Sequence, residues 1–416
     1  MTSEPKKILV VGGGISGITA ALEAAEVGHE VVLVEREPYL GGRVVRMYQY
    51  FPKLCPPTCG LEINYKRLRN NPRVQVLTMA EVTGVSGSAG DFEVKIKVRP
   101  RYVTGKQPVS QAHLDAVKSE VTCDFDLGLS SIKALALPHG MAYPYLHVLD
   151  KDALTGGELE ALKQAEPKGA IDLDQKEEEL TLKVGAIVMA TGWKPFDAKN
   201  MPDLGFGKIK DVINNVQMER YCAPNGPTGG KVVRPSSSEA PRTVAFVQCV
   251  GSRDENHLPY CSGVCCMGTL KQARYVRSRL PEAEISVFYI DIRPIGRLEK
   301  FYYDLLGDDK IKFIKGKVPK ITEDGGRPVL HVEEMLNQKK LTAPFDLVVL
   351  ATGVVPSTAD EKLPGAGVTY DPNGFVVDDA KAGLIGAGCV KRPLDVSRSV
   401  KDATAAALKA IQIVRR

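Results

Sequence analysis

The chain of 416 residues has 44% hydrophobic and 25% charged positions, which is the composition of an ordinary globular protein long enough for two or three well-buried domains. Its 55 lysines and arginines against 50 acidic residues give a net charge of +5 without a block of like charges, so we expect no nucleic-acid partner. No apolar run approaches the roughly eighteen residues of a membrane span, and a chain of this size needs neither metal nor disulfide merely to stay folded.

The first predicted elements form a βαβ unit. Without an apolar signal segment, the sequence enters the strand "KILVV", the turn "GGGISG", the helix "ITAALEAAEVG" and the strand "EVVLVE". We therefore expect a cytoplasmic α/β protein with a parallel, doubly wound sheet. In a reducing compartment, its nine unevenly spaced cysteines indicate free thiols, metal ligands or redox groups rather than a disulfide framework.

The turn of this unit predicts a dinucleotide site. Gly12, Gly14 and Gly17 fit G-x-G-x-x-G between a strand and a helix. These glycines allow a tight turn, close approach to a pyrophosphate and packing of helix on strand, while the helix N-terminus attracts phosphate. Glu35 closes the second strand, where a carboxylate can accept hydrogen bonds from ribose hydroxyls.

The following segment favours FAD over NAD. Gly42 and Arg43 in "REPYLGGRVV" resemble the Gly-Gly-Arg turn that passes beside the pyrophosphate and ribityl chain in FAD enzymes of the two-dinucleotide-binding-domain class. Cys55 and Cys59 follow as a C-x3-C pair. They either form a dithiol facing the flavin, as in disulfide reductases with a different spacing, or pack in a proline-fixed loop that lines a partner surface.

Two similar strands mark the organisation of the remaining chain. "VGAIVMATGW" (184–193) and "FDLVVLATGVVP" (345–356) both end in Ala-Thr-Gly, where small residues permit a sharp turn. We predict an FAD domain over 1–204 and 340–416, with an irregular insertion at 100–180, and a second nucleotide-binding-like domain over 205–339. We expect the fold class to be α/β with two Rossmann-like domains, similar to that of thioredoxin reductases and disulfide reductases.

The second domain lacks the glycine fingerprint that its strand "TVAFVQCV" leads us to expect. Gly251 stands alone, and Gly263 and Gly268 have the wrong spacing. Asp291 closes the next strand, as a ribose-binding acid would. Half of a nicotinamide site is therefore present, and we expect no nicotinamide binding in the usual mode.

Four cysteines occupy the place of the missing fingerprint. Cys249, Cys261, Cys265 and Cys266 have the spacing C-x11-C-x3-C-C at a strand end, in a loop and at a helix start. Soft sulfur ligands select zinc or an iron–sulfur cluster, but adjacent cysteines fit zinc knuckles poorly. Beside a flavin, a one-electron carrier has the better chemical logic. A redox disulfide and simple burial of small thiols remain alternatives.

The C-terminal segment predicts the closing part of the flavin site. A strand, the turn "GAGC" and an Ala-rich helix resemble the segment that aims a helix N-terminus at the flavin's pyrimidine edge in such enzymes. Gly388 is followed by Cys389 where the usual pattern has aspartate, which leaves the ribityl hydrogen bond without its usual acceptor. The predicted cofactor residues are Gly12, Gly14, Ser16, Gly17, Glu35, Arg36, Gly42, Arg43, Val82, Thr191, Gly192, Gly353, Gly388 and Val396.

The combined motifs resemble the flavoprotein A subunit family of heterodisulfide reductases over nearly the whole chain. The residues that carry the resemblance are "VQCVGSRDE", "YCSGVCCMGTLKQA", "LGGRV" and "VGAIVMATGW". The resemblance implies FAD and an unusual [4Fe-4S] cluster, with Cys249, Cys261, Cys265 and Cys266 as its ligands. It also implies an electron-transfer component of a larger complex.

One departure points to a branch of that family. Methanogen A subunits carry cluster-binding cysteines in the insertion, whereas only Cys123 stands there in this chain. This is most similar to the A subunit of the quinone-interacting membrane-bound oxidoreductase complex of sulfate reducers. That likeness implies a B subunit with FAD and iron–sulfur clusters, a membrane C subunit with haem, and electron exchange with adenylylsulfate reductase. Membrane contact on the cytoplasmic face would then be made only through a partner.

Two rival functions follow from the same residues. The first is a free-standing NAD(P)H-dependent disulfide reductase that uses Cys55 and Cys59. The second is a scaffold with structural FAD and a zinc ion on the cysteines. No His, Ser or carboxylate constellation indicates acid–base or nucleophilic catalysis, so no catalytic residue is predicted.

Overall fold

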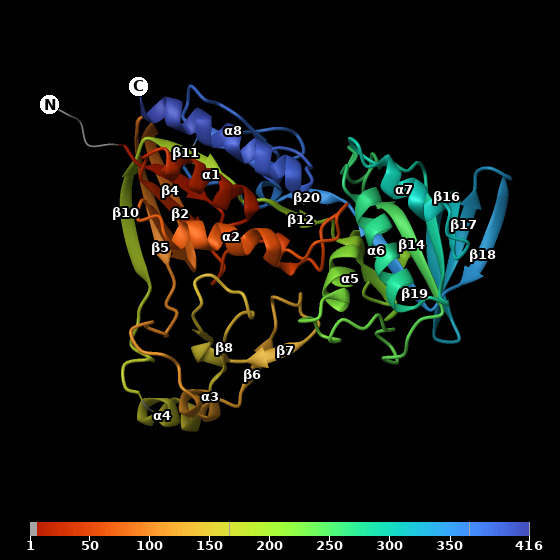
Figure 1. Ribbon diagram of the computed structural model, residues 1–416, viewed down its shortest axis with the longest axis horizontal. Helices are drawn as coiled ribbons and strands as arrows, with labels where there is room; N and C mark the ends of the chain where they lie inside the picture. The colour runs from red at the N-terminus through yellow and green to blue at the C-terminus, as the bar shows by residue number, and fades with distance from the viewer. Residues whose placement is uncertain (1–5, 166, 366, 416) are drawn as a thin grey trace.

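The computed structural model describes residues 6–165, 167–365 and 367–415. The described chain forms two α/β units and a smaller insertion that lies beneath the first unit in the view of Figure 1. The antiparallel pair β12 (Trp193–Pro195) and β20 (Val354–Pro356) joins the two units. No helix of the described part is both long and apolar enough to cross a membrane.

The first unit is a five-stranded parallel sheet in the order β23-β11-β1-β2-β3. Its strands are β1 (Ile8–Val11), β2 (Val31–Glu35), β3 (Val74–Thr78), β11 (Ala186–Met189) and β23 (Leu384–Gly386). Helices α1 (Ile15–Glu26), α2 (Thr58–Arg69) and α8 (Val396–Val414) cover one face. On the other lies an antiparallel sheet of β4 (Ala80–Ser88), β5 (Asp91–Val98) and β10 (Glu178–Val184).

The central strands β1 and β11 are apolar at every position because they are buried on both faces. Ile8 and Val10 of β1 pack in the core beneath the helices. Leu9 and Val11 pack in the core toward the antiparallel sheet. Alternate residues of one strand therefore serve two cores, which explains why the sequence shows a continuous apolar run rather than an alternating one.

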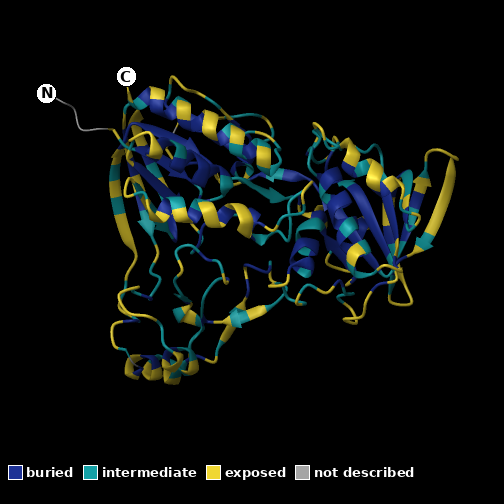
Figure 2. Ribbon diagram, in the orientation of Figure 1, coloured by how far each residue is buried: buried dark blue, intermediate teal, exposed yellow. Residues whose placement is uncertain are grey.

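The insertion (99–177) is small and mostly exposed. It contains α3 (Gln111–Ala116), β6 (Glu120–Thr122), β7 (Ser131–Lys133), β8 (Leu135–Ala136), β9 (Val148–Leu149) and α4 (Gly156–Gln164). Figure 2 shows its helices largely in the exposed colour. A capping box of Thr155 and Glu158 starts α4, and a core that includes Val117, Leu149 and Leu162 holds the insertion together.

The second unit is a seven-stranded sheet in the order β13-β19-β14-β15-β16-β17-β18. Its strands are β13 (Val212–Asn214), β14 (Thr243–Val250), β15 (Glu284–Tyr289), β16 (Ile311–Asp324), β17 (Arg327–Glu334), β18 (Lys339–Pro344) and β19 (Leu347–Thr352). Its helices are α5 (Asn215–Cys222), α6 (Cys265–Arg279) and α7 (Glu299–Leu306). The first five strands in that order are parallel, and β16, β17 and β18 form an antiparallel meander.

The predicted boundary after residue 339 needs correction. In the second sheet, β18 pairs with β17 and β19 pairs with β14. The chain therefore returns to the first unit only through β20. Every residue of β19 is buried, and such a strand suits the interior of either parallel sheet. The pattern alone therefore could not assign it, and its pairing with β14 decides the matter.

Short elements complete the fold. The strands β21 (Thr369–Tyr370) and β22 (Val376–Val377) form a small hairpin ahead of β23. The 3-10 helices are η1 (Val44–Arg46), η2 (Lys151–Ala153), η3 (Ala198–Asn200), η4 (Pro202–Leu204), η5 (Ser357–Ala359) and η6 (Gly388–Val390).

One side chain joins the first unit, the insertion and the second unit. Arg220 of α5 is fully buried and forms an ion pair of 2.8 Å with Asp126 of the insertion. It donates a hydrogen bond of 3.1 Å to the carbonyl oxygen of Arg46, just after the Gly-Gly-Arg turn. Its guanidinium also lies over the ring of Phe125, 4.4 Å from the centroid. The buried guanidinium of Arg220 thus helps to hold the two units in their relative orientation.

Candidate flavin site and cysteine loop

Two positions of the glycine loop, Gly12 and Gly17, accept only glycine. An added Cβ at Gly17 would lie 1.8 Å from the carbonyl oxygen of Gly12, so α1 could not pack on the loop. An added Cβ at Gly12 would lie 2.5 Å from the carbonyl oxygen of Ala190, and its φ of 106° suits glycine. Gly14 is the N-cap of α1, with no side-chain cap and no acidic residue in the first turn. The helix end therefore offers backbone N–H groups to an anion.

Glu35 at the end of β2 lies against this loop, and its contact with a ribose stays a prediction. Its Oε2 accepts a hydrogen bond of 2.6 Å from the backbone N–H of Gly13, and its Oε1 accepts one of 2.9 Å from Glu37. Burial raises the pKa of this carboxyl, while the two backbone N–H groups act in the opposite direction. A carboxylate held at the end of β2 is the arrangement that contacts a ribose in dinucleotide folds.

The Gly-Gly-Arg turn closes on the glycine loop. The N–H of Gly41 donates to the carbonyl oxygen of Gly13 at 2.8 Å, and a Cβ on Gly42 would be 3.0 Å from the Cα of Gly14. Arg43 lies over the ring of Trp193 at 5.0 Å, and its Nε donates to the Trp193 carbonyl oxygen at 2.5 Å. Burial lowers the pKa of Arg43 to about 10.

The turn after β11 meets the segment after β20. Thr191 Oγ1 accepts a hydrogen bond of 2.8 Å from Ser357, whose N–H donates to the carbonyl oxygen of Gly192. Arg36 pairs at the surface with Glu361 at 2.5 Å, an exposed ion pair that stabilises little. Val82 is half-buried on β4 and packs against the core under the parallel sheet.

The C-terminal turn packs against the start of α1. A Cβ on Gly388 would lie 2.1 Å from Ser16 Oγ, and its φ of 74° is left-handed. The Gly388 N–H donates to Asp402 Oδ2 of α8 at 2.8 Å, so an aspartate that sequence reasoning missed serves this turn. Cys389 is buried, and its Sγ donates to the carbonyl oxygen of Leu394 at 3.2 Å. Val396, predicted as a cofactor residue, is the first residue of α8.

These contacts provide a test of whether the chain suits a dinucleotide. Tightly packed backbone at Gly12, Gly17 and Gly42 leaves a surface without side chains beside an uncapped helix end. Glu35 lies at its rim. The residues present therefore fit FAD, which the glycine loop, Glu35 and the Gly-Gly-Arg turn would hold.

The cysteine loop (249–266) lies at the carboxyl edge of the second sheet. Cys249 is near the end of β14 with a φ of 61°, and Cys265 and Cys266 are the first residues of α6. All four cysteines are free thiols. Burial raises the pKa values of Cys249 and Cys265, and raises that of Cys266 to about 11. Without a bound metal these three thiols stay protonated at neutral pH, so they are poor nucleophiles.

The surroundings of these four thiols indicate whether they suit a metal centre. Charge on Cys249 and Cys261 raises the pKa values of Cys265 and Cys266, so the four sulfurs share one electrostatic neighbourhood. Within the described ranges, no group of three or more His, Cys, Asp or Glu is placed so that it could hold a metal ion. A cube-shaped cluster holds its four thiolates farther apart than one ion does, and the soft donor set suits iron–sulfur.

The carboxylate of Asp291 is not free to contact a ribose. Its carboxylate pairs with Arg253 and with Arg293, the latter at 2.9 Å. Burial opposes ionisation, but the hydrogen bonds and charges of the two arginines lower the pKa of this carboxyl. Cys266 Sγ donates to the carbonyl oxygen of Asp291 at 3.8 Å, which ties this group to the cysteine loop.

Gly353 lies against the cysteine loop rather than against the glycine loop. A Cβ there would be 2.4 Å from Ser252 Oγ. The N–H of Val354 donates to Ser262 Oγ at 2.8 Å, and Cys265 Sγ donates to the carbonyl oxygen of Thr352 at 3.6 Å. The segment that leaves the second sheet is thus fixed to the cysteines.

Cys55 and Cys59 lie near the joint between the units. Cys55 is half-buried, and Cys59 is exposed in the first turn of α2. The preceding loop contacts the second unit, because Lys271 Nζ of α6 donates to the carbonyl oxygen of Gln49 at 2.7 Å. Both cysteines are free thiols.

Comparison with known proteins first shows which fold and which family model the chain resembles. Residues 7–97 match the family described as FAD dependent oxidoreductase. The fold is similar to the thioredoxin reductase of T. acidophilum, with 13% identity, 98% of each chain covered and a TM-score of 0.54. It is also similar to the bacillithiol disulfide reductase of Bacillus cereus, with 14% identity, 99% of each chain covered and a TM-score of 0.53. The predicted fold class is confirmed, and residues 7–97 are similar to FAD-dependent oxidoreductases.

Sequence comparison then identifies a narrower group of similar proteins. The chain is 36% identical over 423 residues to the A subunit of the ferredoxin:CoB-CoM heterodisulfide reductase of Methanosarcina mazei, covering 98% of this chain and 53% of the relative. It is 37% identical over 419 residues to an iron-sulfur A subunit of the CoB--CoM heterodisulfide reductase of Methanopyrus kandleri, covering 97% and 64%. The chain spans between about half and two thirds of these relatives. The resemblance to heterodisulfide reductase A subunits is confirmed, and the likeness to the quinone-interacting branch stays a prediction.

Proposed function

We propose that this chain is an electron-transfer component of a multi-subunit reductase, carrying FAD in the first unit and a [4Fe-4S] cluster on Cys249, Cys261, Cys265 and Cys266. The observation that carries the proposal is the position of these thiols. They occupy the carboxyl edge of a second nucleotide-type sheet, where a glycine loop would otherwise stand. When bound, FAD exchanges two electrons, whereas an iron–sulfur cluster carries one at a time.

A short segment connects the two proposed centres. Thr352 contacts Cys265, and the following strand β20 pairs with β12 of the first unit. Trp193 of β12 in turn contacts Arg43 of the Gly-Gly-Arg turn. A few residues of packed backbone therefore run from the cysteine loop to the proposed flavin site, which supports electron exchange between them.

The relatives and the buried thiols support the same function. The relative from Methanopyrus kandleri is named an iron-sulfur component of its reductase, and the name of the relative from Methanosarcina mazei includes ferredoxin. We infer that this chain likewise works with protein partners rather than with a free nicotinamide, since Asp291 is held by two arginines. Burial raises the pKa values of Cys265 and Cys266, and a bound metal would favour their thiolate forms.

We propose further that the chain belongs to the quinone-interacting branch. Cys123, the cysteine of the insertion, is buried in the core with Phe125 and Ala142, so it packs rather than ligates. The insertion then has no ligands for the clusters of methanogen A subunits. The implied partners are B and C subunits and adenylylsulfate reductase, with membrane contact made through the C subunit. Co-expression with those subunits tests this branch, and failure to co-purify removes it without touching the electron-transfer proposal.

The first experiment is metal and flavin analysis of anaerobically purified protein. We expect about four irons and four acid-labile sulfides per FAD, with an EPR signal after reduction. Cys265→Ala/Cys266→Ala should lose the iron and keep the FAD. Cys59→Ala, which changes an exposed thiol outside the cysteine loop, should keep both.

Two outcomes would contradict the proposal. Flavin without iron in protein never exposed to oxygen rules out the cluster. Flavin reduced by NAD(P)H in the isolated chain, with disulfide reduction lost and flavin reduction kept in Cys59→Ala, would instead establish a disulfide reductase acting through Cys55 and Cys59.

A further inference from the structure

Residues 46–49, which we call the joint segment, connect the Gly-Gly-Arg turn to the second unit. Arg43 is the N-cap of η1, and η1 leads directly into the joint segment. Residues 47–49 belong to no helix or strand. The conformation of the joint segment therefore depends on the side chains that contact its backbone.

Side chains of the second unit hold two backbone groups of the joint segment. Glu219 Oε2 of α5 accepts a hydrogen bond of 3.0 Å from the N–H of Tyr48. Lys271 Nζ of α6 donates a hydrogen bond of 2.7 Å to the carbonyl oxygen of Gln49, and the hydroxyl of Tyr275 donates a longer one of 3.3 Å to the same oxygen. The segment that follows the turn is thus fixed from the other unit.

The two charged side chains that hold the joint segment form a buried ion pair. Glu219 Oε1 and Lys271 Nζ are 2.9 Å apart, and the two side chains are 8% and 4% exposed. Gln272 Nε2 also donates to this carboxylate, at 2.7 Å. Because replacing a buried ion pair by apolar residues of similar volume is often neutral for stability, stability alone does not account for the pair. What the pair supplies, and apolar residues cannot, is an acceptor and a donor aimed at the joint segment.

An open cleft beside the joint segment leaves little packing to replace these hydrogen bonds. Tyr48, Gln49 and Leu54 line one side of the cleft, and Arg277 and Leu305 of the second unit also line it. Its volume is about 560 Å³. Without the ion pair, the joint segment would therefore face solvent along part of its length.

Tight packing connects the joint segment to the glycine loop. An added Cβ at Gly41 would lie 2.8 Å from the Cβ of Val45, so η1 packs closely on the turn. At the other end of the turn, a Cβ on Gly42 would be 3.0 Å from the Cα of Gly14. A displacement of the joint segment would therefore pass through η1 to the contact between the turn and the glycine loop.

We propose that Glu219 and Lys271 of the second unit are positioning residues for the flavin site of the first. By fixing the joint segment, they hold the Gly-Gly-Arg turn in the conformation that binds FAD. The inference rests on the FAD binding proposed above. Binding of FAD and closure of the joint are then coupled, and such a coupling is reciprocal.

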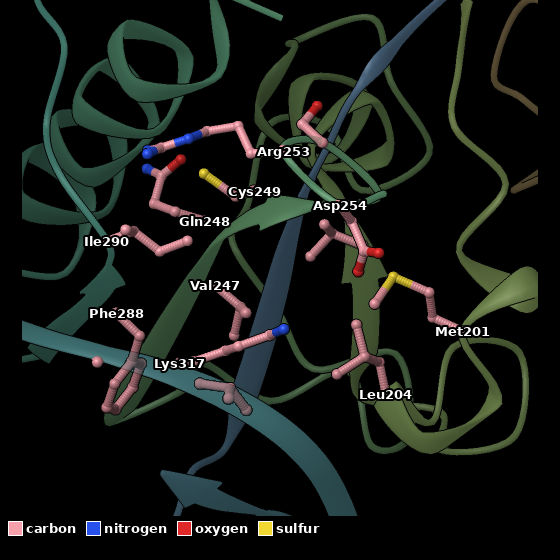
Figure 3. Close-up of a pocket in the computed structure, with 14 residues that line it drawn as sticks. Met201, Leu204, Val247, Gln248, Cys249, Arg253, Asp254, Phe288, Ile290 and Lys317 are labelled. Carbon is pink, nitrogen blue, oxygen red and sulfur yellow. The ribbon is translucent and has the colours of Figure 1, made fainter. Parts of the chain in front are cut away.

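The cysteine loop takes no part in this positioning. The small cavity beside Cys249 is lined by Arg253 and Asp254 (Figure 3), and none of the described residues 46–49 lies on its wall. The coupling is therefore expected whether or not the cysteines hold a cluster.

The test is the rate at which FAD leaves the holoprotein, measured as the rise in flavin fluorescence on dilution. Glu219→Leu/Lys271→Met nearly keeps the volume of the pair, leaves neither charge unpaired and removes both of its hydrogen bonds to the joint segment. We expect this variant to release FAD about tenfold faster than the wild type, which corresponds to about 1.4 kcal/mol. The measurement is made at a temperature where circular dichroism shows every variant folded.

A second buried ion pair of the same unit provides the matched control. Asp211 and Arg234 are 2.8 Å apart, and the aspartate side chain is 1% exposed. The other side-chain contacts of Asp211 are with Ser236 of the same unit. Asp211→Leu/Arg234→Met therefore makes the same chemical change away from the joint segment, and it should leave the release rate unchanged.

Hydrogen exchange measures the same coupling from the second unit. In wild-type protein, FAD should slow amide exchange in the joint segment and in α5. In Glu219→Leu/Lys271→Met, FAD should still protect the glycine loop but no longer protect α5.

The outcomes separate this inference from the function on which it rests. A wild-type release rate in Glu219→Leu/Lys271→Met overturns the inference, and so does an equal acceleration in the control, which would show that any loss of stability in the second unit releases FAD. If the first variant does not fold, Glu219→Gln/Lys271→Met replaces it, because it keeps an acceptor for the Tyr48 N–H and removes the bond to Gln49; a wild-type rate there also overturns the inference. Wild-type protein that binds no FAD overturns the proposed function instead.

Discussion

Arg220→Met should strongly destabilise the joint between the units. The guanidinium of Arg220 is fully buried and pairs with Asp126, which is itself 7% exposed. Methionine fills most of the volume but leaves the Asp126 carboxylate without its cation, and the hydrogen bond of 2.6 Å from Ser130 Oγ does not replace that charge. Removing one partner of a buried ion pair costs about 3–5 kcal/mol. For a cooperative unit of roughly 200 residues this lowers Tm by about 6–20 °C.

Differential scanning calorimetry at a fixed, saturating FAD concentration measures this shift, because ligand binding alone changes Tm. Adding Asp126→Asn to Arg220→Met should raise Tm again, since it removes the uncompensated charge. Arg67→Met breaks a partly exposed pair with Glu26 and should shift Tm by no more than about 2–4 °C. A Tm for Arg220→Met within that same small range, or a further drop in the double variant, would refute the reasoning.

Two further predictions concern the first unit and its joint. Gly17→Ala places a Cβ 1.8 Å from the backbone oxygen of Gly12, so the purified variant should contain little bound FAD by absorbance. Gly60→Ala, whose added Cβ meets nothing within 4 Å, should bind FAD normally. Equal flavin content in the two variants would contradict the role of the loop. Burial and neighbouring arginines lower the pKa of His139 from 6.5 to about 4, so the stability that its neutral form contributes is present above pH 6.5 and lost as pH falls toward 4. This amounts to about 3 kcal/mol, and His139→Phe should flatten the dependence of the urea midpoint on pH in that window; an unchanged slope would show that another group titrates.

Features fixed by local backbone constraints could be predicted from the sequence. Gly12 and Gly17 are required by close backbone contacts that no other residue allows, so their spacing identifies the loop without any structure. Glu35 follows because the end of the second strand in a βαβ unit always lies beside that loop. The cysteine loop was predicted for the same reason, since strand end and helix start meet at one edge of the sheet.

Features that depend on long-range partners could not be predicted. The ion pair of Arg220 with Asp126 joins residues 94 positions apart, and the local sequence around neither residue indicates this pairing. Asp402 reaches Gly388 from the second turn of α8, where an aspartate looks like an ordinary surface residue. Likewise, the strand Leu347–Thr352 fits either sheet by its apolar pattern, and pairing alone assigns it.

Asp291 shows how one fold supports a different chemistry in its second unit. The sequence places this carboxylate at the end of a strand, as in a ribose-binding acid, and in the structure β15 ends at Tyr289, two residues before Asp291. Here, however, the carboxylate holds Arg253 and Arg293 beside the cysteine loop. A dinucleotide needs a free acid for its ribose, whereas four thiolates around iron carry negative charge that adjacent guanidinium groups offset. In the proposed function, the same strand end serves an anionic metal centre because its acid is paired with two arginines.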